Sequence, residues 1–210
     1  MNLDTLLVYF LVAFFYITSP GPAIVLAIVN GIRTDMRTVA ITSFANILGL
    51  FILSTASILG LGAILTTSAT LFMIVKIIGA FYLIYLGFKF IRNNGIINIE
   101  DVNEEKNKKT KKVYFFESFI LAITNPKPIL FFTAIFPQFL DLNSSITIQF
   151  FIMTGIFLII SFSSLCTYGY LSKRSKAYLT DKNRMNLINK LTGGLFFFMG
   201  FALLRMKNNS

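Results

Sequence analysis

Long apolar stretches alternate with short polar segments along the entire chain. Each stretch is close to the ~20 residues that a helix needs to cross the hydrocarbon core of a bilayer. In hydrocarbon such a segment is helical, because an open strand would leave its backbone groups unpaired. The pattern therefore predicts an all-α, polytopic membrane protein, with one transmembrane domain over residues 1–210 and six transmembrane helices. The six stretches are Leu3–Asn30, Val39–Leu65, Leu71–Ile91, Val113–Phe139, Ile146–Leu171 and Leu187–Arg205.

The two halves of the chain resemble each other. The tetrads Ser19-Pro20-Gly21-Pro22 and Asn125-Pro126-Lys127-Pro128 are 106 positions apart, and Asp35 and Asp141 have the same separation. A duplicated unit of three helices enters the membrane from opposite sides in its two copies, which is a common construction of secondary transporters. The sequence therefore predicts two inverted three-helix repeats. Their approximate bounds are 3–92 for repeat one, 93–112 for a cytoplasmic linker and 113–207 for repeat two.

Composition supports a membrane protein and excludes several other classes. The chain is 55% hydrophobic and 13% charged, whereas a soluble domain has about 25% charged residues. It has no histidine and one cysteine, Cys166. These counts argue against histidine-based catalysis, an internal disulfide and a cysteine or histidine metal site. We therefore expect no catalytic residue, no metal and no cofactor, and predict that the protein is not an enzyme.

The positive charge is concentrated in the loops. The net charge of +10 could suggest nucleic acid, but the basic residues lie in short runs between apolar stretches. Such runs are typical of the cytoplasmic side of a membrane protein. They gather on the side opposite the two termini, so the distribution predicts that both termini are external. We expect contact with membrane lipid and none with nucleic acid.

The proline tetrads predict breaks in helices one and four. A proline inside a helix removes one N–H and leaves the carbonyl four residues earlier without its donor. In hydrocarbon such a backbone survives where it lines a polar cavity or is buried in protein. Freed carbonyls, hydroxyls and half-helix amides could then bind a zwitterion; the alternative is a pair of kinks that serve packing alone. The substrate-binding candidates are Thr18, Ser19, Pro20, Gly21, Pro22, Thr124, Asn125, Pro126 and Lys127.

Three charged residues are candidates for the transport step. Lys127 lies deep in helix four, where a charge costs about 2.5–3.5 kcal/mol on insertion scales. It could attract a substrate carboxylate or carry a proton; the alternative is a structural lysine that donates to broken-helix carbonyls. Asp35 and Asp141 occupy equivalent turns on opposite sides of the membrane. They are gating candidates, although N-capping of the following helices explains them as well.

These motifs resemble the LysE/RhtB family of amino-acid exporters over nearly the whole chain. The matching segments are Ser19-Pro20-Gly21-Pro22, the run Lys76 to Gly87, Thr124 to Lys127 continuing to Phe139, and Ile188 to Gly193. The resemblance implies an efflux carrier for amino acids driven by the proton gradient, and it points to the Pro-Gly-Pro and Asn-Pro-Lys residues as the motif. Many relatives have an acidic residue after the helix-two glycine. Here Leu50 follows Gly49, so the resemblance assigns no proton-carrying residue.

The combined prediction is a secondary-active efflux transporter. It would export an amino acid or a derivative across the bacterial cytoplasmic (inner) membrane by proton antiport, with H⁺ as the coupling ion and a homo-oligomer possible. The alternatives are an exporter of a metal ion or another small solute, or a non-transport membrane protein of related architecture.

Overall fold

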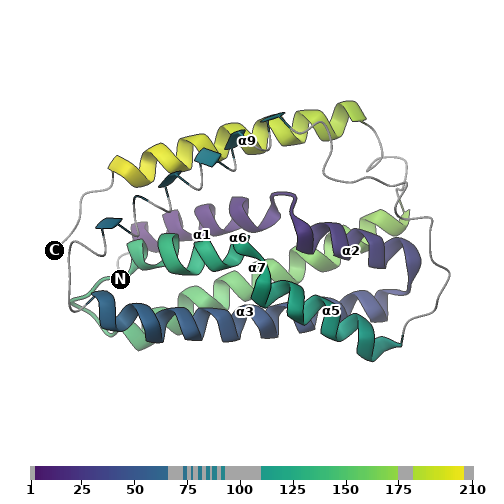
Figure 1. Ribbon diagram of the computed structural model, residues 1–210, viewed down its shortest axis with the longest axis horizontal. Helices are drawn as coiled ribbons and strands as arrows, with labels where there is room; N and C mark the ends of the chain where they lie inside the picture. Colours follow the sequence, from purple (N-terminus) through teal and green to yellow (C-terminus); the bar gives the residue numbers. More distant parts are fainter. Residues whose placement is uncertain are drawn as a thin grey trace.

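The computed structural model describes residues 3–65, single helical positions between 73 and 92, and residues 110–174 and 182–205. Within these ranges the chain forms an elongated bundle of helices (Figure 1). The polytopic all-α fold predicted from the apolar stretches is confirmed. The elements are α1 (Leu3–Thr18), α2 (Pro22–Arg33), α3 (Met36–Leu65), α5 (Lys111–Thr124), α6 (Pro126–Leu130), a π-helical turn (Phe131–Ile135), a 3₁₀ turn (Phe136–Phe139), α7 (Ile146–Arg174) and α9 (Lys182–Arg205).

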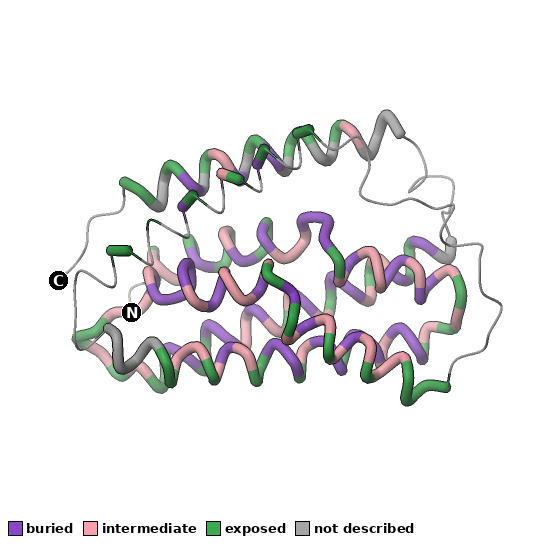
Figure 2. Tube along the Cα trace, in the orientation of Figure 1, coloured by how far each residue is buried: buried purple, intermediate pink, exposed green. Residues whose placement is uncertain are grey.

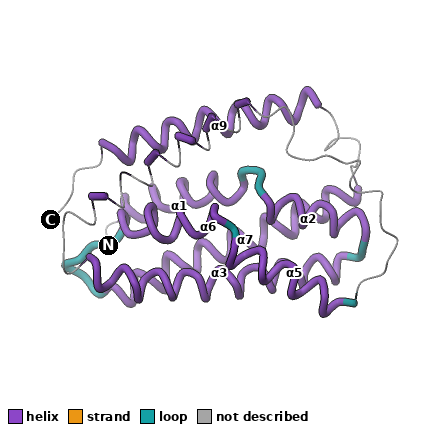
Figure 3. Tube along the Cα trace, in the orientation of Figure 1, coloured by secondary structure: helices purple, strands orange, loops and turns teal. Residues whose placement is uncertain are grey.

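The first apolar stretch is broken, as its proline tetrad predicts. Helix α1 ends at Thr18 and α2 begins at Pro22, and the two are bent by 55° relative to each other. Pro22 occupies the first position of α2. A backbone N–H at this position would have no partner within the helix, so proline loses nothing there, and its fixed φ suits the helix. Gly21 before it is extended, with φ −169° and ψ 178°. The break lies in the middle of the bundle rather than at its end (Figure 3).

The fourth apolar stretch is also interrupted at its proline tetrad. Helix α5 ends at Thr124, Asn125 is extended, and α6 begins at Pro126. Beyond α6 the chain continues to Phe139 through the π-helical and 3₁₀ turns instead of a regular α-helix. The Ser57 hydroxyl of α3 donates to the Phe132 carbonyl over 2.8 Å, so this irregular backbone is anchored to a neighbouring helix. Both predicted interruptions are therefore confirmed.

The helices of the two halves pack in a crossed arrangement. Helix α2 packs along α7, α5 packs along α3, and α3 packs along α7. The chain runs from α1 to α2 in the opposite direction to its course from α5 to α6, and α3 runs opposite to α7 (Figure 1). In two inverted, equivalent halves, the packing of α5 on α3 has its counterpart in the packing of α1 on α7, which the structure also contains. The assignment of residues 3–92 and 113–207 as repeats agrees with it and remains a prediction.

Several described segments are long and apolar enough to cross a membrane. They are Met36–Gly60, Lys111–Phe139 and Ile146–Ser172, with the bent pair α1 and α2 as a fourth. These agree with four of the predicted stretches to within a few residues. Most of the stretch Leu71–Ile91 lies outside the described residues, and α9 begins earlier than predicted, at Lys182. The count of six spans therefore stays a prediction.

An aromatic cluster forms the core on one side of the breaks. The buried Tyr9 of α1 donates its hydroxyl to the Met153 carbonyl of α7 over 2.9 Å. The irregular end of helix four packs against this pair. Outward-facing positions are exposed and largely apolar, as expected of a lipid-facing surface (Figure 2). Besides Tyr9 and Met153, the cluster contains Phe131, Phe132, Phe136, Phe139, Phe150 and Phe157.

Close packing of α2 on α7 predicts a strict size limit at Gly31. A Cβ at this position would overlap the Gly169 carbonyl oxygen of α7. We expect Gly31→Ala to lower the free energy of unfolding by about 1–3 kcal/mol, because α2 and α7 must separate. Thermal unfolding in detergent measures the effect. Gly155→Ala is the matched control, since nothing lies within 4 Å of a Cβ there. Equal stability of the two variants would contradict this packing.

Candidate functional site

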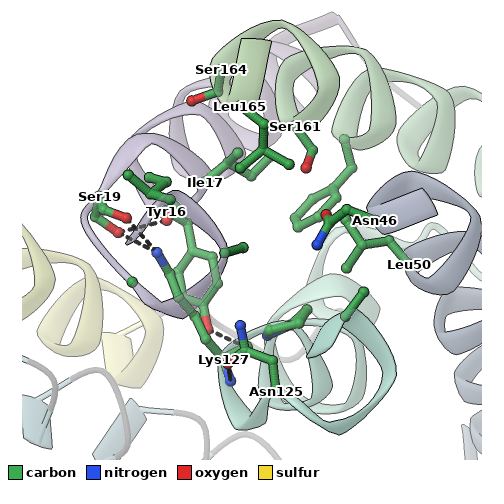
Figure 4. A pocket seen from close by; sticks show the side chains of 16 residues that line it. Tyr16, Ile17, Ser19, Asn46, Leu50, Asn125, Lys127, Ser161, Ser164 and Leu165 are labelled. Atoms are coloured by element: carbon green, nitrogen blue, oxygen red, sulfur yellow. Dashed lines mark hydrogen bonds between the residues drawn. The ribbon is translucent and has the colours of Figure 1, made fainter. Parts of the chain in front are cut away.

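A cavity of about 50 Å³ lies between the two helix breaks. Its walls come from α1, α2, α3, α5, α6 and α7, so residues from both halves of the chain meet there. Figure 4 looks into this space, with the Ser19 and Lys127 side on one wall and α3 and α7 on the others. The labelled residues that line it are Tyr16, Ile17, Ser19, Asn46, Leu50, Asn125, Lys127, Ser161, Ser164 and Leu165.

At the first break, side-chain hydroxyls donate hydrogen bonds to the carbonyls that the prolines leave without donors. The Ser19 hydroxyl donates to the Tyr16 carbonyl over 2.6 Å. The Tyr168 hydroxyl of α7 donates to the Thr18 carbonyl over 2.9 Å. These carbonyls were expected to be acceptors for a substrate, but the structure gives both of them donors from the protein. The broken backbone is thereby stabilised without an occupant in the cavity.

At the second break, Asn125 satisfies the start of α6. Its side-chain oxygen accepts the Lys127 backbone N–H over 3.1 Å. This amide was expected to be a donor for substrate, but the Asn125 side chain occupies it. The Tyr16 hydroxyl of α1 donates to the Lys127 carbonyl over 2.5 Å, which links the second break to the helix that precedes the first.

The Lys127 side chain joins the two breaks directly. Its ammonium Nζ donates to the Ser19 carbonyl over 2.8 Å and to the Ser19 hydroxyl oxygen over 2.6 Å. It also lies 5.1 Å from the centroid of the Tyr16 ring, within range of a cation–π interaction. These contacts include the structural role that the sequence left open, donation to a broken-helix carbonyl. They use two of the three ammonium donors.

The N-terminus of α2 adds fixed positive potential to the same wall. Gly21, Ala23 and Ile24 line the cavity. The first amides of a helix have no carbonyl partner within it and carry partial positive charge. A Cβ at Gly21 would lie 3.4 Å from Lys127 Cδ and 3.6 Å from Nζ, so the bare backbone faces the lysine closely. This wall therefore combines donors for an anion with the acceptor atoms of Ser19.

The structure brings together only part of the predicted site. Ser19, Gly21, Asn125 and Lys127 line the cavity, whereas Pro20, Pro22 and Pro126 shape the breaks without lining it. The Thr18 and Thr124 hydroxyls were expected to face the site. They donate instead to carbonyls of their own helices, those of Phe14 and Ile120, over 2.7 and 2.8 Å. Back-bonding of this kind is the usual outcome for a threonine in an apolar helix.

The sequence reasoning missed the far wall of the cavity. Asn46 and Leu50 of α3 and Ser161 of α7 line it, and each is 4% exposed. A polar residue within an apolar span is a signal that could have identified Asn46 and Ser161. Tyr16 gave no such signal, because a tyrosine in a helix rich in aromatic residues is expected to serve packing in the hydrophobic core. Among the described lining residues Lys127 is the only charged one.

Comparison with known proteins decides the family. The sequence model of the LysE type translocator matches residues 14–207, a range that includes both breaks and every described cavity residue. The chain belongs to the LysE type translocator family. The resemblance inferred from the motifs is thereby confirmed. Members of this family are transporters rather than enzymes, so this translocator is a membrane exporter.

Two relatives are similar to this translocator over nearly their full length. A membrane protein of Vibrio cholerae serotype O1, described as uncharacterized, is 30% identical over 99% of this chain and 100% of its own. The uncharacterized membrane protein YrhP of Bacillus subtilis is 27% identical over 96% of this chain and 98% of its own. No solved structure matches the translocator.

The two gating candidates lie in connections, Asp35 between α2 and α3 and Asp141 between the 3₁₀ turn and α7. These two connections are at opposite ends of the bundle (Figure 3). Asp35 caps α3 of the translocator, because its Oδ1 accepts the Thr38 backbone N–H over 2.8 Å and the Thr38 hydroxyl over 2.6 Å. These bonds lower the pKa of the Asp35 carboxyl. Asp141 accepts the Ser144 hydroxyl over 2.7 Å and so organises the turn before α7. Neither residue lines the cavity, and their role in gating stays a prediction.

Substitution of Asp35 can separate capping from gating. Asparagine caps a helix about as well as aspartate but has no charge. If Asp35 only caps α3, Asp35→Asn retains thermal stability and export, whereas Asp35→Leu loses stability. Because the folded pKa is lowered, the contribution of the carboxylate to stability is present above the unfolded pKa. It disappears as the pH falls through the folded pKa.

The measurements are unfolding temperature against pH and export rate per molecule. Asp141→Asn is the companion variant at the other end of the bundle. Loss of export in Asp35→Asn at wild-type stability would show that the charge, and not the cap, is what transport requires.

Proposed function

We propose that this translocator exports an amino acid, or a closely related zwitterion, in exchange for protons. The observation that carries the proposal is the position of the Lys127 ammonium. It is bonded to Ser19 at one helix break, borders the cavity and lies against the open N-terminus of α2. Donors for a carboxylate and acceptors for an ammonium therefore lie next to each other on one wall.

Donors and acceptors lie side by side on this wall, which suits the two charges of an α-amino acid. The carboxylate would bind the amides at the start of α2, where Ala23 and Ile24 line the cavity. The ammonium would bind the Ser19 carbonyl and hydroxyl oxygens, which are the atoms that Lys127 holds in this structure. The substrate side chain would then extend toward α3 and α7.

Competition for Ser19 would couple export to protons. Exchange requires that the proton and the substrate do not occupy the carrier together. A protonated Lys127 occupies the acceptor atoms of Ser19 and repels a second ammonium. A deprotonated Lys127 would release Ser19 to the substrate. A proton that enters from outside would then return Lys127 to Ser19 and expel the substrate, which gives antiport with the required direction.

The proposed location is the cytoplasmic membrane of a bacterium, with both termini external. The described start of α1 and end of α9 lie at the same end of the bundle (Figure 1). The connection from α2 to α3, which follows Arg33 and precedes Arg37, lies at the opposite end. Basic connections are typical of the cytoplasmic side.

Substitutions of Lys127 test the coupling mechanism. In Lys127→Met the proton-binding group is removed but Ser19 stays open to substrate. We expect this variant to lose accumulation driven by a pH gradient, to less than about a tenth of the wild-type rate, while substrate–substrate exchange continues. Arginine stays protonated, so Lys127→Arg should lose both activities. Uptake and counterflow of labelled amino acids in everted membrane vesicles measure the two processes.

A matched control accounts for stability. Lys127→Met leaves the buried Ser19 carbonyl without its donor, at a cost of about 1–3 kcal/mol. Ser57→Ala removes the donor of the Phe132 carbonyl, away from the cavity, so it should lose similar stability and keep export per molecule. Accumulation by Lys127→Met at half the wild-type rate per molecule or better would remove Lys127 from the mechanism.

A further inference from the structure

Two buried polar side chains on the far wall of the cavity have no hydrogen-bond partner among the described residues. Asn46 of α3 and Ser161 of α7 are each 4% exposed and line the cavity. Figure 4 shows both on the side opposite Ser19 and Lys127. Within the described part of the chain, neither side chain takes part in a hydrogen bond. Ser164, nearly one turn along α7 from Ser161, also lines the cavity, and its hydroxyl is buried without a partner.

Within the described part of the chain, some buried hydroxyls of the same helices are satisfied, whereas those of Ser43 in α3 and Thr154 in α7 lack a partner. Ser54 and Thr42 of α3 donate to the carbonyls of Phe51 and Val39 over 2.8 and 2.9 Å. A buried polar group without a partner is uncommon in a native structure and is costly unless something pairs with it. Three such groups, on Asn46, Ser161 and Ser164, lie together on the cavity wall where the bound substrate would place its side chain. They are therefore available to pair with it.

The charges around the cavity argue against a charged substrate side chain. No described lining residue is acidic. The described acidic residues lie elsewhere: Asp4 at the start of α1, Glu117 on α5, and Asp35 and Asp141 in the connections before α3 and α7. A second ammonium on the far wall would therefore be buried without a carboxylate, and a side-chain carboxylate there would be buried away from Lys127, which lies on the opposite wall. Both are strongly unfavourable. A neutral substrate side chain that forms hydrogen bonds would pair with the polar groups of this wall.

The size of the cavity limits the length of that side chain. Its volume of about 50 Å³ corresponds to roughly four water-sized spheres. Leu50 and Phe157 are buried at its edge and leave apolar surface beside the two polar groups. A short side chain that combines carbon atoms with one hydroxyl or amide group fits this lining.

We propose that Asn46 and Ser161 select an amino acid with a short, uncharged side chain that carries a hydroxyl or an amide. This inference rests on the proposed function, because it assumes that the zwitterion occupies the Ser19 wall. Asn46 and Ser161 then act as specificity-determining residues. They pair with the substrate side chain and discriminate against charged or bulky ones.

A panel of labelled amino acids in everted vesicles tests the selection. The panel contains serine, threonine and asparagine, the small apolar alanine and valine, the bulky leucine and phenylalanine, and the charged lysine and glutamate. We expect wild-type uptake to be fastest for the first group. Asn46→Leu and Ser161→Ala should each slow uptake of that group by about five- to tenfold relative to alanine and valine. Ser54→Ala is the matched control, since that hydroxyl bonds within its own helix.

The outcomes separate this inference from the function on which it rests. Fastest uptake of lysine, glutamate or a bulky residue would overturn the inference and leave amino-acid export intact. An equal loss for every amino acid in Asn46→Leu and Ser161→Ala would show a structural role and would overturn the selection. Uptake of no amino acid above the level of vesicles without the protein would overturn both proposals.

Discussion

A carbonyl buried in hydrocarbon needs a hydrogen-bond donor, and this constraint organises the centre of the molecule. At the first break, the Ser19 and Tyr168 hydroxyls donate to the Tyr16 and Thr18 carbonyls, which the prolines leave without their helical donors. At the second, the Asn125 side chain accepts the Lys127 backbone N–H, and the Tyr16 hydroxyl donates to the Lys127 carbonyl. Lys127 then bonds one break to the other. The breaks can lie in the middle of an apolar bundle because each supplies part of what the other needs.

This arrangement connects the stability of the fold with transport. The bond between Lys127 and Ser19 joins α6 to the α1–α2 break, so it joins the two halves of the chain. In the proposed mechanism, a substrate that takes the acceptors of Ser19 would replace a contact between the halves. Occupation of the site and the relation of the two halves are therefore linked through the same two oxygen atoms. The far wall can vary in chemistry without disturbing this junction, because Asn46 and Ser161 form no hydrogen bond within the part of the chain that the structure describes.

The sequence predicts the features that depend on local pattern. The length of the apolar stretches predicts the helices. The proline tetrads predict both interruptions, and the second tetrad places Lys127 deep in its apolar stretch. Contacts between distant segments are not readable in this way: Tyr16 and Lys127 are 111 residues apart, and Thr18 and Tyr168 are 150 apart. The direction of a hydroxyl is equally hidden, so Thr18 and Thr124 were expected in the site. The family match covers residues 14–207, and the roles of the individual motif residues stay predictions.

The most direct test of the account is protection of the cavity by substrate. With Cys166 replaced by alanine, Ala23→Cys places a thiol on the cavity wall at the start of α2. The rate of maleimide labelling is measured on purified protein with and without a saturating mixture of the common amino acids. Asn143→Cys, in an exposed turn, is the control. The account predicts that the mixture slows labelling at position 23 about tenfold or more and leaves labelling at position 143 unchanged. The reason is that a substrate bound in a small cavity leaves no room there for the maleimide. Equal labelling at position 23 in both conditions, by a protein that still exports an amino acid, would place the substrate elsewhere.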